Sequence, residues 1–322
     1  MPIPSKSKEL DRLSYTPELS ASMVYSELER YHLETIFDPL ASTSGAAGYF
    51  KLQNIRIISN DFSLFTFVKG KALWENNVFF IPEEVLNVLT DPKARLPKLD
   101  HYKKLGGIYL TDTERKWLEY WRKVVNEIRE EYIRALSETA VCLVIDHWIT
   151  AKRFGETFEW KPVDLLKFYI GHVNRNILDN EESNEMWLTD PTELAEKSVA
   201  DVLFINPPAL KGYETFGIRE HTLESWLRGT DDFPLSKIAP RGTLGSSFDS
   251  VADYLTALSG LLKAADHMPI WAFALSNRQP FTRLEFDEII KSLGRRTREM
   301  DLKIARQFFT RRAPDTIVIA SV

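Results

Sequence analysis

The sequence is poor in cysteine and in long apolar segments, and each shortage excludes a class of protein. A single cysteine, Cys142, occurs among the 322 residues, so an internal disulfide and a zinc site built on a cysteine cluster are excluded. No apolar run approaches the roughly 18 residues that a transmembrane helix needs, and the start MPIPSKSKELDR lacks the apolar core of a signal peptide. We therefore expect a soluble, cytoplasmic protein in which Cys142 is a buried packing residue.

The chain also has no excess of positive charge. Its 41 lysines and arginines stand against 46 aspartates and glutamates, which gives a formal charge of -5 and removes any argument from overall basicity to a nucleic-acid partner. Local clusters remain candidates for phosphate contacts, although each is equally well explained as a solvated face. These residues are Lys103, Lys104, Lys237, Arg241, Arg295, Arg296, Arg298, Arg311 and Arg312.

Several catalytic signatures are missing. The six histidines show neither HxxxH nor HExxH spacing, so a zinc hydrolase is unsupported. The sequence contains no GxSxG nucleophile elbow and no GxxxxGK[ST] phosphate loop, which leaves a serine hydrolase of that type and a P-loop NTPase without support.

Strand and helix patterns divide the chain into four segments. Residues 1–30 are polar and contain prolines without strong periodicity, so we expect a leader that wraps or frays. Residues 31–77 read as strand, small-residue turn, helix and strand, followed by another helix. Residues 78–184 carry long helical patterns, and residues 185–322 return to strand and helix alternation. This order predicts an α/β protein with one open, mostly parallel sheet that is interrupted by a large helical insertion.

Two expected helices begin with a capping-box pattern, in which a Thr hydroxyl and a Glu carboxylate satisfy backbone donors at the helix start. The first pair is Thr111 and Glu114, and the second is Thr282 and Glu285. Gly294 is a stop signal for the second of these helices.

The tetrapeptide Asn206-Pro207-Pro208-Ala209 directly follows the apolar run Val202–Ile205, which is typical of a strand covered on both faces. Open α/β sheets bind ligands at the carboxyl ends of their strands. Two prolines remove amide donors and leave carbonyl oxygens as acceptors, and the Asn206 carboxamide adds another acceptor. Such a site could hold an exocyclic amino group, but an isolated NPP is more often a rigid turn.

The small-residue turn at residues 42–48 is placed where a βα loop approaches a nucleotide. Small side chains permit close approach of a ligand, and they also occur wherever a helix packs tightly on a sheet. Asp61 ends the next strand, a position from which an acidic residue hydrogen-bonds ribose hydroxyls. A helix N-cap is an equally good interpretation of Asp61.

Taken together, these segments resemble the adenine-specific DNA methyltransferases with a DPPY-type tetrapeptide. The resemblance covers residues 32–300, and the order of the motifs is more specific than any one of them. It implies a Rossmann-like sheet, S-adenosylmethionine as cofactor, double-stranded DNA as partner and a flipped adenine as substrate. The segments that carry it are FDPLASTSGAAGYFKLQNIRIISND, TDTERKWLEYWRKVVNEI, EMWLTDPTELAEKSVADVLFINPP and WAFALSNRQPFTRLEFDEIIKSLG.

The resemblance also implies roles for individual residues. Asn206 and the Pro207 carbonyl would accept hydrogen bonds from the target amino group and direct its lone pair toward the methyl group, with Pro208 completing the catalytic turn. Residues 31–77 would form the cofactor-binding half, residues 185–322 the catalytic half, and residues 78–184 a region that recognises the target. The cofactor-binding residues would be Asp38, Ser42, Ser44, Gly45, Asp61 and Asp190.

Four positions depart from the family pattern. Ser42 and Ser44 stand where glycines are usual, and Asn206 replaces an acidic residue. Ala209 stands where an aromatic ring normally stacks on the extruded base, and stacking of this kind contributes roughly 1–3 kcal/mol. Rings that could substitute are Tyr213 and Phe216.

Two hypotheses follow from these departures. The first is a DNA adenine N6-methyltransferase that takes part in DNA methylation, as in a restriction-modification system. The second is a catalytically degenerate methyltransferase fold that serves as a DNA-binding or scaffold subunit of a restriction or phage-defence complex; Ser42, Ser44 and Ala209 favour it.

Overall fold

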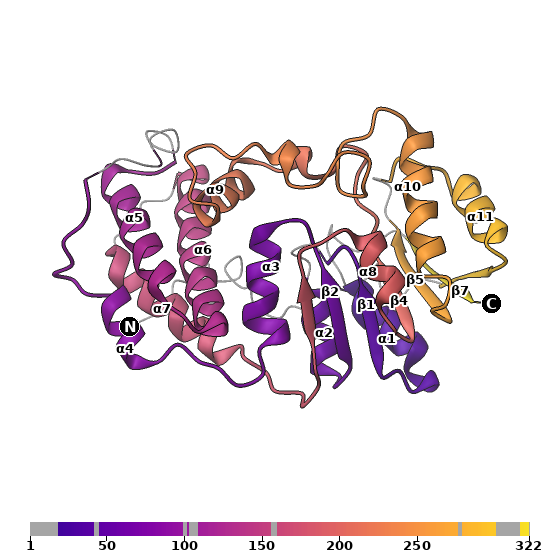
Figure 1. Cartoon of the computed structure of the whole chain (residues 1–322), viewed down its shortest axis with the longest axis horizontal. Coiled ribbons are helices and arrows are strands. Elements are labelled where there is room, and N and C mark those ends of the chain that lie inside the picture. The colour runs from indigo at the N-terminus through magenta and orange to yellow at the C-terminus, as the bar shows by residue number, and fades with distance from the viewer. Residues whose placement is uncertain are drawn as a thin grey trace. The chain divides into compact units, whose positions relative to one another are not determined.

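The chain folds into two compact units, each assembled from segments that are far apart in the sequence. Among the described residues, the sheet unit comprises those within 15–67, 180–215 and 238–322, and the helical unit comprises those within 68–179 and 216–237. Figure 1 shows the elements of both in this computed structural model. The structure describes residues 19–41, 45–98, 102, 109–155, 160–275, 279–300 and 316–321.

The sheet unit contains a seven-stranded sheet with the order β3-β2-β1-β4-β5-β7-β6. Strands β1 to β5 are paired in parallel, whereas β7 runs antiparallel to both β5 and β6. The prediction of a mostly parallel α/β sheet is therefore confirmed, and the sheet is consistent with a methyltransferase fold. The strands are β1 (Thr35–Asp38), β2 (Arg56–Asn60), β3 (Glu185–Trp187), β4 (Val202–Ile205), β5 (Ile270–Leu275), β6 (Arg296–Glu299) and β7 (Thr316–Ser321).

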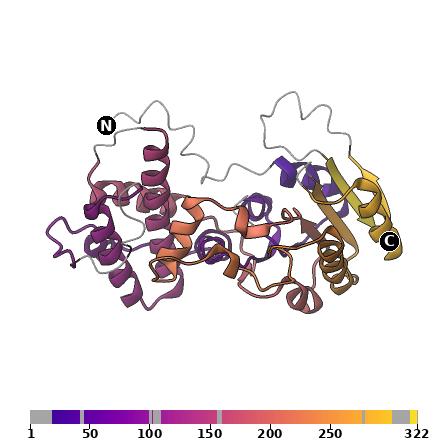
Figure 2. The same cartoon turned by 90° about the horizontal axis from the view of Figure 1, so that it is seen from above.

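Helices pack against the sheet, whose middle strand β4 is apolar along its whole length. Every residue of β4 is buried, as expected of a strand that packs on both faces. Helices α10 and α11 lie beside β5 and β7 in both views (Figures 1 and 2), where Tyr254 of α10 and Phe286 of α11 are fully buried in the shared core. The helices of this unit are α1 (Leu19–Leu28), η2 (Glu29–Tyr31), α2 (Ala46–Leu52), α8 (Pro191–Lys197), η5 (Gly212–Thr215), α10 (Val251–Ala264) and α11 (Arg283–Ser292).

Helix α1 lies within residues 1–30, the segment for which the sequence predicts a leader that wraps or frays. Residues 19–28 are helical and contact α2. The buried side chains of α1 are Ala21, Val24 and Leu28, and their spacing of three and four residues places them on one helix face. Three small or medium apolar residues give a weak periodic signal, which explains why the segment reads as merely polar. Residues 1–18 lie outside the described part of the chain.

Tryptophan side chains join the helices of the helical unit to one another. The ring centroids of Trp121 and Trp148 lie 5.9 Å apart in a stacked arrangement. The Trp226 indole N–H donates a hydrogen bond to the Leu118 carbonyl at 3.0 Å. Cys142 is fully buried in α6, as predicted, and burial raises the pKa of its thiol. The elements of this unit are α3 (Leu64–Gly70), which begins in the sheet unit, η3 (Lys71–Glu75), α4 (Glu83–Leu89), α5 (Asp112–Glu127), α6 (Glu131–Arg153), α7 (Pro162–Arg175), α9 (Ile218–Leu227) and η6 (Leu235–Lys237).

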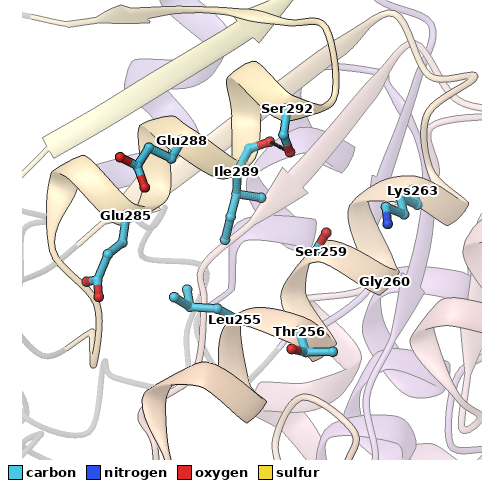
Figure 3. Close-up of a pocket in the computed structure, with 9 residues that line it drawn as sticks. All are labelled: Leu255, Thr256, Ser259, Gly260, Lys263, Glu285, Glu288, Ile289 and Ser292. Carbon is cyan, nitrogen blue, oxygen red and sulfur yellow. Dashed lines mark hydrogen bonds between the residues drawn. The ribbon is translucent and has the colours of Figure 1, made fainter.

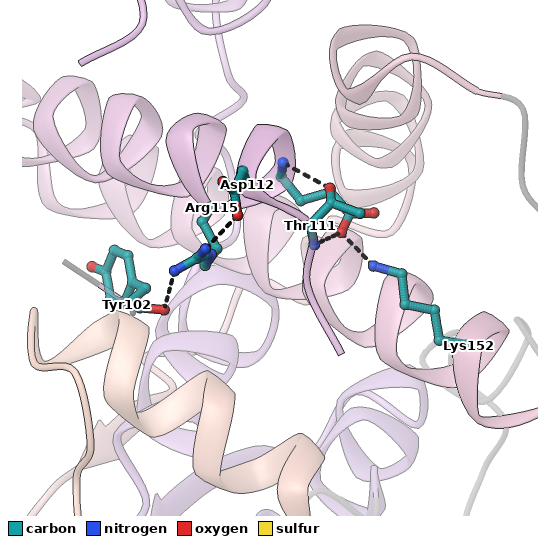
Figure 4. Close-up of polar contacts among 6 residues, drawn as sticks. Tyr102, Thr111, Asp112, Arg115 and Lys152 are labelled. Atoms are coloured by element: carbon teal, nitrogen blue, oxygen red, sulfur yellow. Dashed lines mark hydrogen bonds and ion pairs between the residues drawn. The ribbon is translucent and has the colours of Figure 1, made fainter. Parts of the chain in front are cut away.

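Both predicted capping boxes are confirmed. Thr111 Oγ1 accepts from the Glu114 amide at 3.2 Å, and the Glu114 carboxylate accepts from the Thr111 amide at 2.6 Å (Figure 4). Lys152 of α6 pairs with the same carboxylate, so the cap of α5 also joins two helices. The second box, at Thr282, begins α11, which ends before Gly294 at a φ of 76°.

Among the described helices, none combines the length and apolar composition that a membrane crossing requires.

Candidate functional site

Asp38 and Asn206 lie at the carboxyl ends of neighbouring parallel strands, which form the site edge of the sheet. β1 pairs in parallel with β4, and the register sets Phe37 opposite Leu203. Asp38 ends β1 and Asn206 follows the last residue of β4, so both lie at the carboxyl ends of adjacent strands. Strand β1 has β2, the next strand in the sequence, on one side and β4 on its other side. This is the topological switch point at which α/β sheets bind ligands.

The turn at Asn206 contains two positions that can still accept a hydrogen bond. Within the described ranges, the half-buried Asn206 carboxamide makes no hydrogen bond. The Pro207 carbonyl accepts from Gln279 Nε2 at 3.2 Å, and the Pro208 carbonyl accepts from the Tyr254 hydroxyl at 2.8 Å. A carbonyl oxygen has two lone pairs, so Pro207 retains one acceptor position beside Gln279. The turn is therefore rigid and still able to accept hydrogen bonds from a ligand.

The segment after the turn is fixed by a close backbone approach. The Gly212 amide donates to the Ala209 carbonyl at 2.8 Å, and the Tyr213 amide donates to the Gly245 carbonyl at 2.9 Å. A Cβ atom on Gly212 would lie 1.8 Å from the Gly245 oxygen, so only glycine fits there. Ala209 itself is half-buried and brings no ring to this edge.

The two rings that were candidates for stacking are placed differently. Tyr213 is 8% exposed, and its ring lies against Gly245, where a Cβ would come within 2.8 Å of the ring. Its face is therefore not open to a base in this arrangement. Phe216 is half-buried in the short connection between η5 and α9.

Asp61 is buried and engaged by the protein. Its Oδ1 accepts from the Ser63 amide at 2.7 Å and from the Tyr213 hydroxyl at 2.5 Å. Ser63 in turn accepts from the Thr66 amide at 3.3 Å, at the start of α3. These contacts match the interpretation of Asp61 as a residue that shapes the start of the following helix. Contact with a ribose would have to share the carboxylate with Tyr213.

The other predicted cofactor residues that the structure describes are Asp38, Gly45 and Asp190. Asp38 is 2% exposed at the end of β1, and Gly45 adopts a left-handed φ of 82° directly before α2. Asp190 follows β3 and caps α8, with its Oδ1 accepting from the Thr192 amide at 2.8 Å. Ser42 and Ser44 lie outside the described residues.

Two further residues hold this edge together, and the sequence patterns did not single them out. Gln279, beyond the end of β5, reaches the Pro207 carbonyl. Asn60, the last residue of β2, is completely buried and hydrogen-bonds the turns that follow β1 and β3. A polar residue at the end of the apolar strand Arg56–Asn60 is the signal that could have identified Asn60, because a buried carboxamide requires partners.

A surface hollow of about 640 Å³ lies elsewhere on the sheet unit. Figure 3 shows it between α10, which contributes Leu255 and Ser259, and α11, which contributes Glu285 and Ile289. None of the predicted site residues lines it. Across the described ranges there is also no group of three or more His, Cys, Asp or Glu side chains that could hold a metal ion.

Among the described residues of the basic clusters, Arg295, Arg298 and Arg241 contact other side chains or carbonyl groups of the protein. The Arg295 guanidinium is buried, donates to the carbonyls of Pro269 at 3.0 Å and Met268 at 2.8 Å, and lies 3.7 Å from the centre of the Trp271 ring. It is a structural group and is not presented to phosphates. Arg298 pairs with Glu27, and Arg241 pairs with Asp249 at 3.2 Å. Outside the described residues are Lys103, Lys104, Arg311 and Arg312.

The chain matches no protein-family model. It is similar to the modification methylase StsI of Streptococcus sanguinis, with 24% identity over 254 residues. The alignment covers 71% of this chain and 38% of the methylase, so the chain spans well under half the length of that relative. The similarity supports the relationship to DNA methyltransferases that the order of the motifs indicates.

Proposed function

We propose that the chain binds S-adenosylmethionine and transfers its methyl group to the N6 amino group of an adenine flipped out of duplex DNA. The observation that carries the proposal is the Asn206 carboxamide, which makes no hydrogen bond among the described residues although it stands at the switch point of the sheet. The similarity to a modification methylase supports the same function. Residues 78–184 would recognise the target sequence.

The residues at this edge suit the chemistry of the cofactor. Asp38 and Asp61 are buried carboxylates at the ends of neighbouring strands, and carboxylates accept hydrogen bonds from the ammonium and hydroxyl groups that S-adenosylmethionine carries. Gly45, directly before α2, has a left-handed φ of 82° that favours glycine. Ser42, Ser44 and Asp190 would complete this pocket. The cofactor supplies an electrophilic methyl group bound to a positively charged sulfur.

The protein's part in the reaction is orientation. Asn206 Oδ1 and the Pro207 carbonyl would each accept an N–H of the adenine amino group, which turns the nitrogen lone pair toward the methyl group. The C–N bond forms as the C–S bond breaks, and the proton lost from the nitrogen passes to solvent. Pro208 holds this geometry through its carbonyl bond to Tyr254. Flipping the base costs roughly a few kcal/mol of stacking.

The decisive experiment replaces Asn206 by Ala. We expect transfer of a tritiated methyl group from S-adenosylmethionine to unmethylated DNA to be abolished, while calorimetry gives nearly unchanged affinity for the cofactor. Asn184→Ala is the matched control, because Asn184 precedes β3 at the opposite edge of the same sheet. Methyl transfer that survives in Asn206→Ala would exclude Asn206 from the mechanism.

A second candidate function is favoured by the contacts of Tyr213. Its hydroxyl donates a hydrogen bond to Asp61, and its ring packs against Gly245. Ala209 has no ring that could stack on a base in its place. A protein of this kind would bind DNA or cofactor without transfer and serve as a scaffold subunit in a restriction or phage-defence complex. Cofactor or DNA binding by the wild-type protein without any methyl transfer would select this function over the first.

A further inference from the structure

Asn60 joins two turns of the sheet edge through a single buried side chain. Its Nδ2 donates to the carbonyl oxygens of Pro39 at 3.0 Å and of Thr189 at 3.1 Å, and its Oδ1 accepts from the Thr189 amide at 3.0 Å. The Asn60 backbone carbonyl also accepts from the Ala41 amide at 2.9 Å. The turn after β1 and the turn after β3 are therefore both tied to the end of β2.

The residues that make these hydrogen bonds are next in sequence to the acidic residues that the proposed function places around the cofactor. Asp38 directly precedes Pro39, Asp190 directly follows Thr189, and Asp61 directly follows Asn60. The spacing of the three carboxylates consequently depends on the contacts of one carboxamide.

The chemical match argues for a specific role rather than for simple filling of space. An apolar side chain of similar volume would fill the same position without the cost of burying a polar group. A carboxamide presents two donors and an acceptor, and here they meet two carbonyls and one amide. Buried polar groups that are fully satisfied rigidify their surroundings and specify one arrangement.

We infer that Asn60 is a positioning residue for the cofactor pocket, which it serves by fixing the turn that follows Asp38 relative to the turn that precedes Asp190. This inference rests on the proposed function, because the pocket is the one proposed for S-adenosylmethionine. Asn60 touches neither cofactor nor substrate in this role. It acts through the two turns.

The test is Asn60→Asp, which keeps the shape of the side chain and one acceptor oxygen but removes both N–H donors. At about pH 8 the introduced carboxylate would face the carbonyls of Pro39 and Thr189, and we expect S-adenosylmethionine to bind at least about 10-fold more weakly. At about pH 6 a fraction of the introduced carboxyl groups is protonated, because burial and two facing carbonyls favour the neutral form. Protonation returns one donor, so the loss of affinity should shrink severalfold.

Two further variants keep the result interpretable. Asn184→Asp removes a buried carboxamide donor from the same sheet unit, where Asn184 bonds the Ile57 amide and Asn180. We expect it to lower the melting temperature comparably but to leave cofactor affinity within about twofold, because it lies at the opposite sheet edge. Asn60→Leu introduces no charge and should bind the cofactor weakly at both pH values.

The outcomes separate the two levels of the proposal. If the wild-type protein binds S-adenosylmethionine and Asn60→Asp and Asn60→Leu bind it equally well, Asn60 has no positioning role and the proposed function stands. If the wild-type protein does not bind the cofactor, the proposed function and the role of Asn60 both fall. If Asn60→Asp does not fold, Asn60→Leu decides the question through its affinity relative to Asn184→Asp.

Discussion

The Tyr213 hydroxyl donates a hydrogen bond to Asp61 Oδ1 at 2.5 Å, although the two residues are 152 positions apart in the sequence. Both side chains are buried. The bond joins the segment after β4, which carries Asn206, to the end of β2. A contact of this kind links the turn proposed for catalysis to a carboxylate proposed for the cofactor.

Removal of this bond should lower stability more than removal of a comparable tyrosine bond to a neutral acceptor. Tyr213→Phe removes the hydroxyl donor from Asp61 Oδ1, which keeps its hydrogen bond from the Ser63 amide. Because a hydrogen bond to a charged group contributes about 1.5–3 kcal/mol, we expect the free energy of unfolding to fall by about that amount. Tyr254→Phe removes a bond to the neutral Pro208 carbonyl, for which about 0.5–1.5 kcal/mol is expected. Urea-induced unfolding measures both. Equal losses would show that the charge of Asp61 contributes nothing to the Tyr213 bond.

Arg295 and Arg296 are neighbours in sequence with opposite environments, which gives a second prediction. Arg295→Gln would remove the guanidinium donors from the carbonyls of Pro269 and Met268 and the group stacked on Trp271. We therefore expect the free energy of unfolding to fall by about 3 kcal/mol. Arg296 is exposed on the edge strand β6, and Arg296→Gln should change stability by less than about 0.5 kcal/mol. Thermal unfolding of the two variants makes the comparison. Similar melting temperatures would contradict the structural role of Arg295.

Local signals in the sequence predicted much of the fold. The capping boxes at Thr111 and Thr282 and the apolar run of β4 are patterns within a few residues, and the structure has each of them where it was expected. The parallel arrangement followed from the alternation of strands and helices. The strand β6 was missed because three of its four residues, Arg296, Arg298 and Glu299, are charged, as residues of edge strands often are.

The contacts at the sheet edge could not be predicted in the same way. The bonds of Tyr213 to Asp61 and of Gln279 to Pro207 join residues 152 and 72 positions apart. Their formation depends on which strands become neighbours, and a single sequence carries no local pattern for that. The sequence therefore indicated which residue types lie at this edge, whereas the structure identifies those that are already engaged.

His147 gives the last prediction, which concerns pH. It is 7% exposed in α6, its Nδ1 lies 3.0 Å from the Tyr169 hydroxyl, and burial lowers its pKa from 6.5 to about 4. A histidine with a lowered pKa stays neutral in the folded state, whereas the same side chain in the unfolded chain takes up a proton below about pH 6.5. The unfolded state therefore binds more protons between the two pKa values, and acid favours unfolding.

We expect the free energy of unfolding to fall as the pH is lowered from about 6.5 toward 4, with a contribution from His147 of about 1.4 kcal/mol per pH unit and at most about 3 kcal/mol in total. His147→Gln retains a hydrogen-bonding group but cannot be protonated, so its stability should depend less steeply on pH in this window. Urea unfolding at several pH values measures the slope. Equal slopes for wild type and His147→Gln would show that His147 is protonated in the folded state as readily as in the unfolded chain.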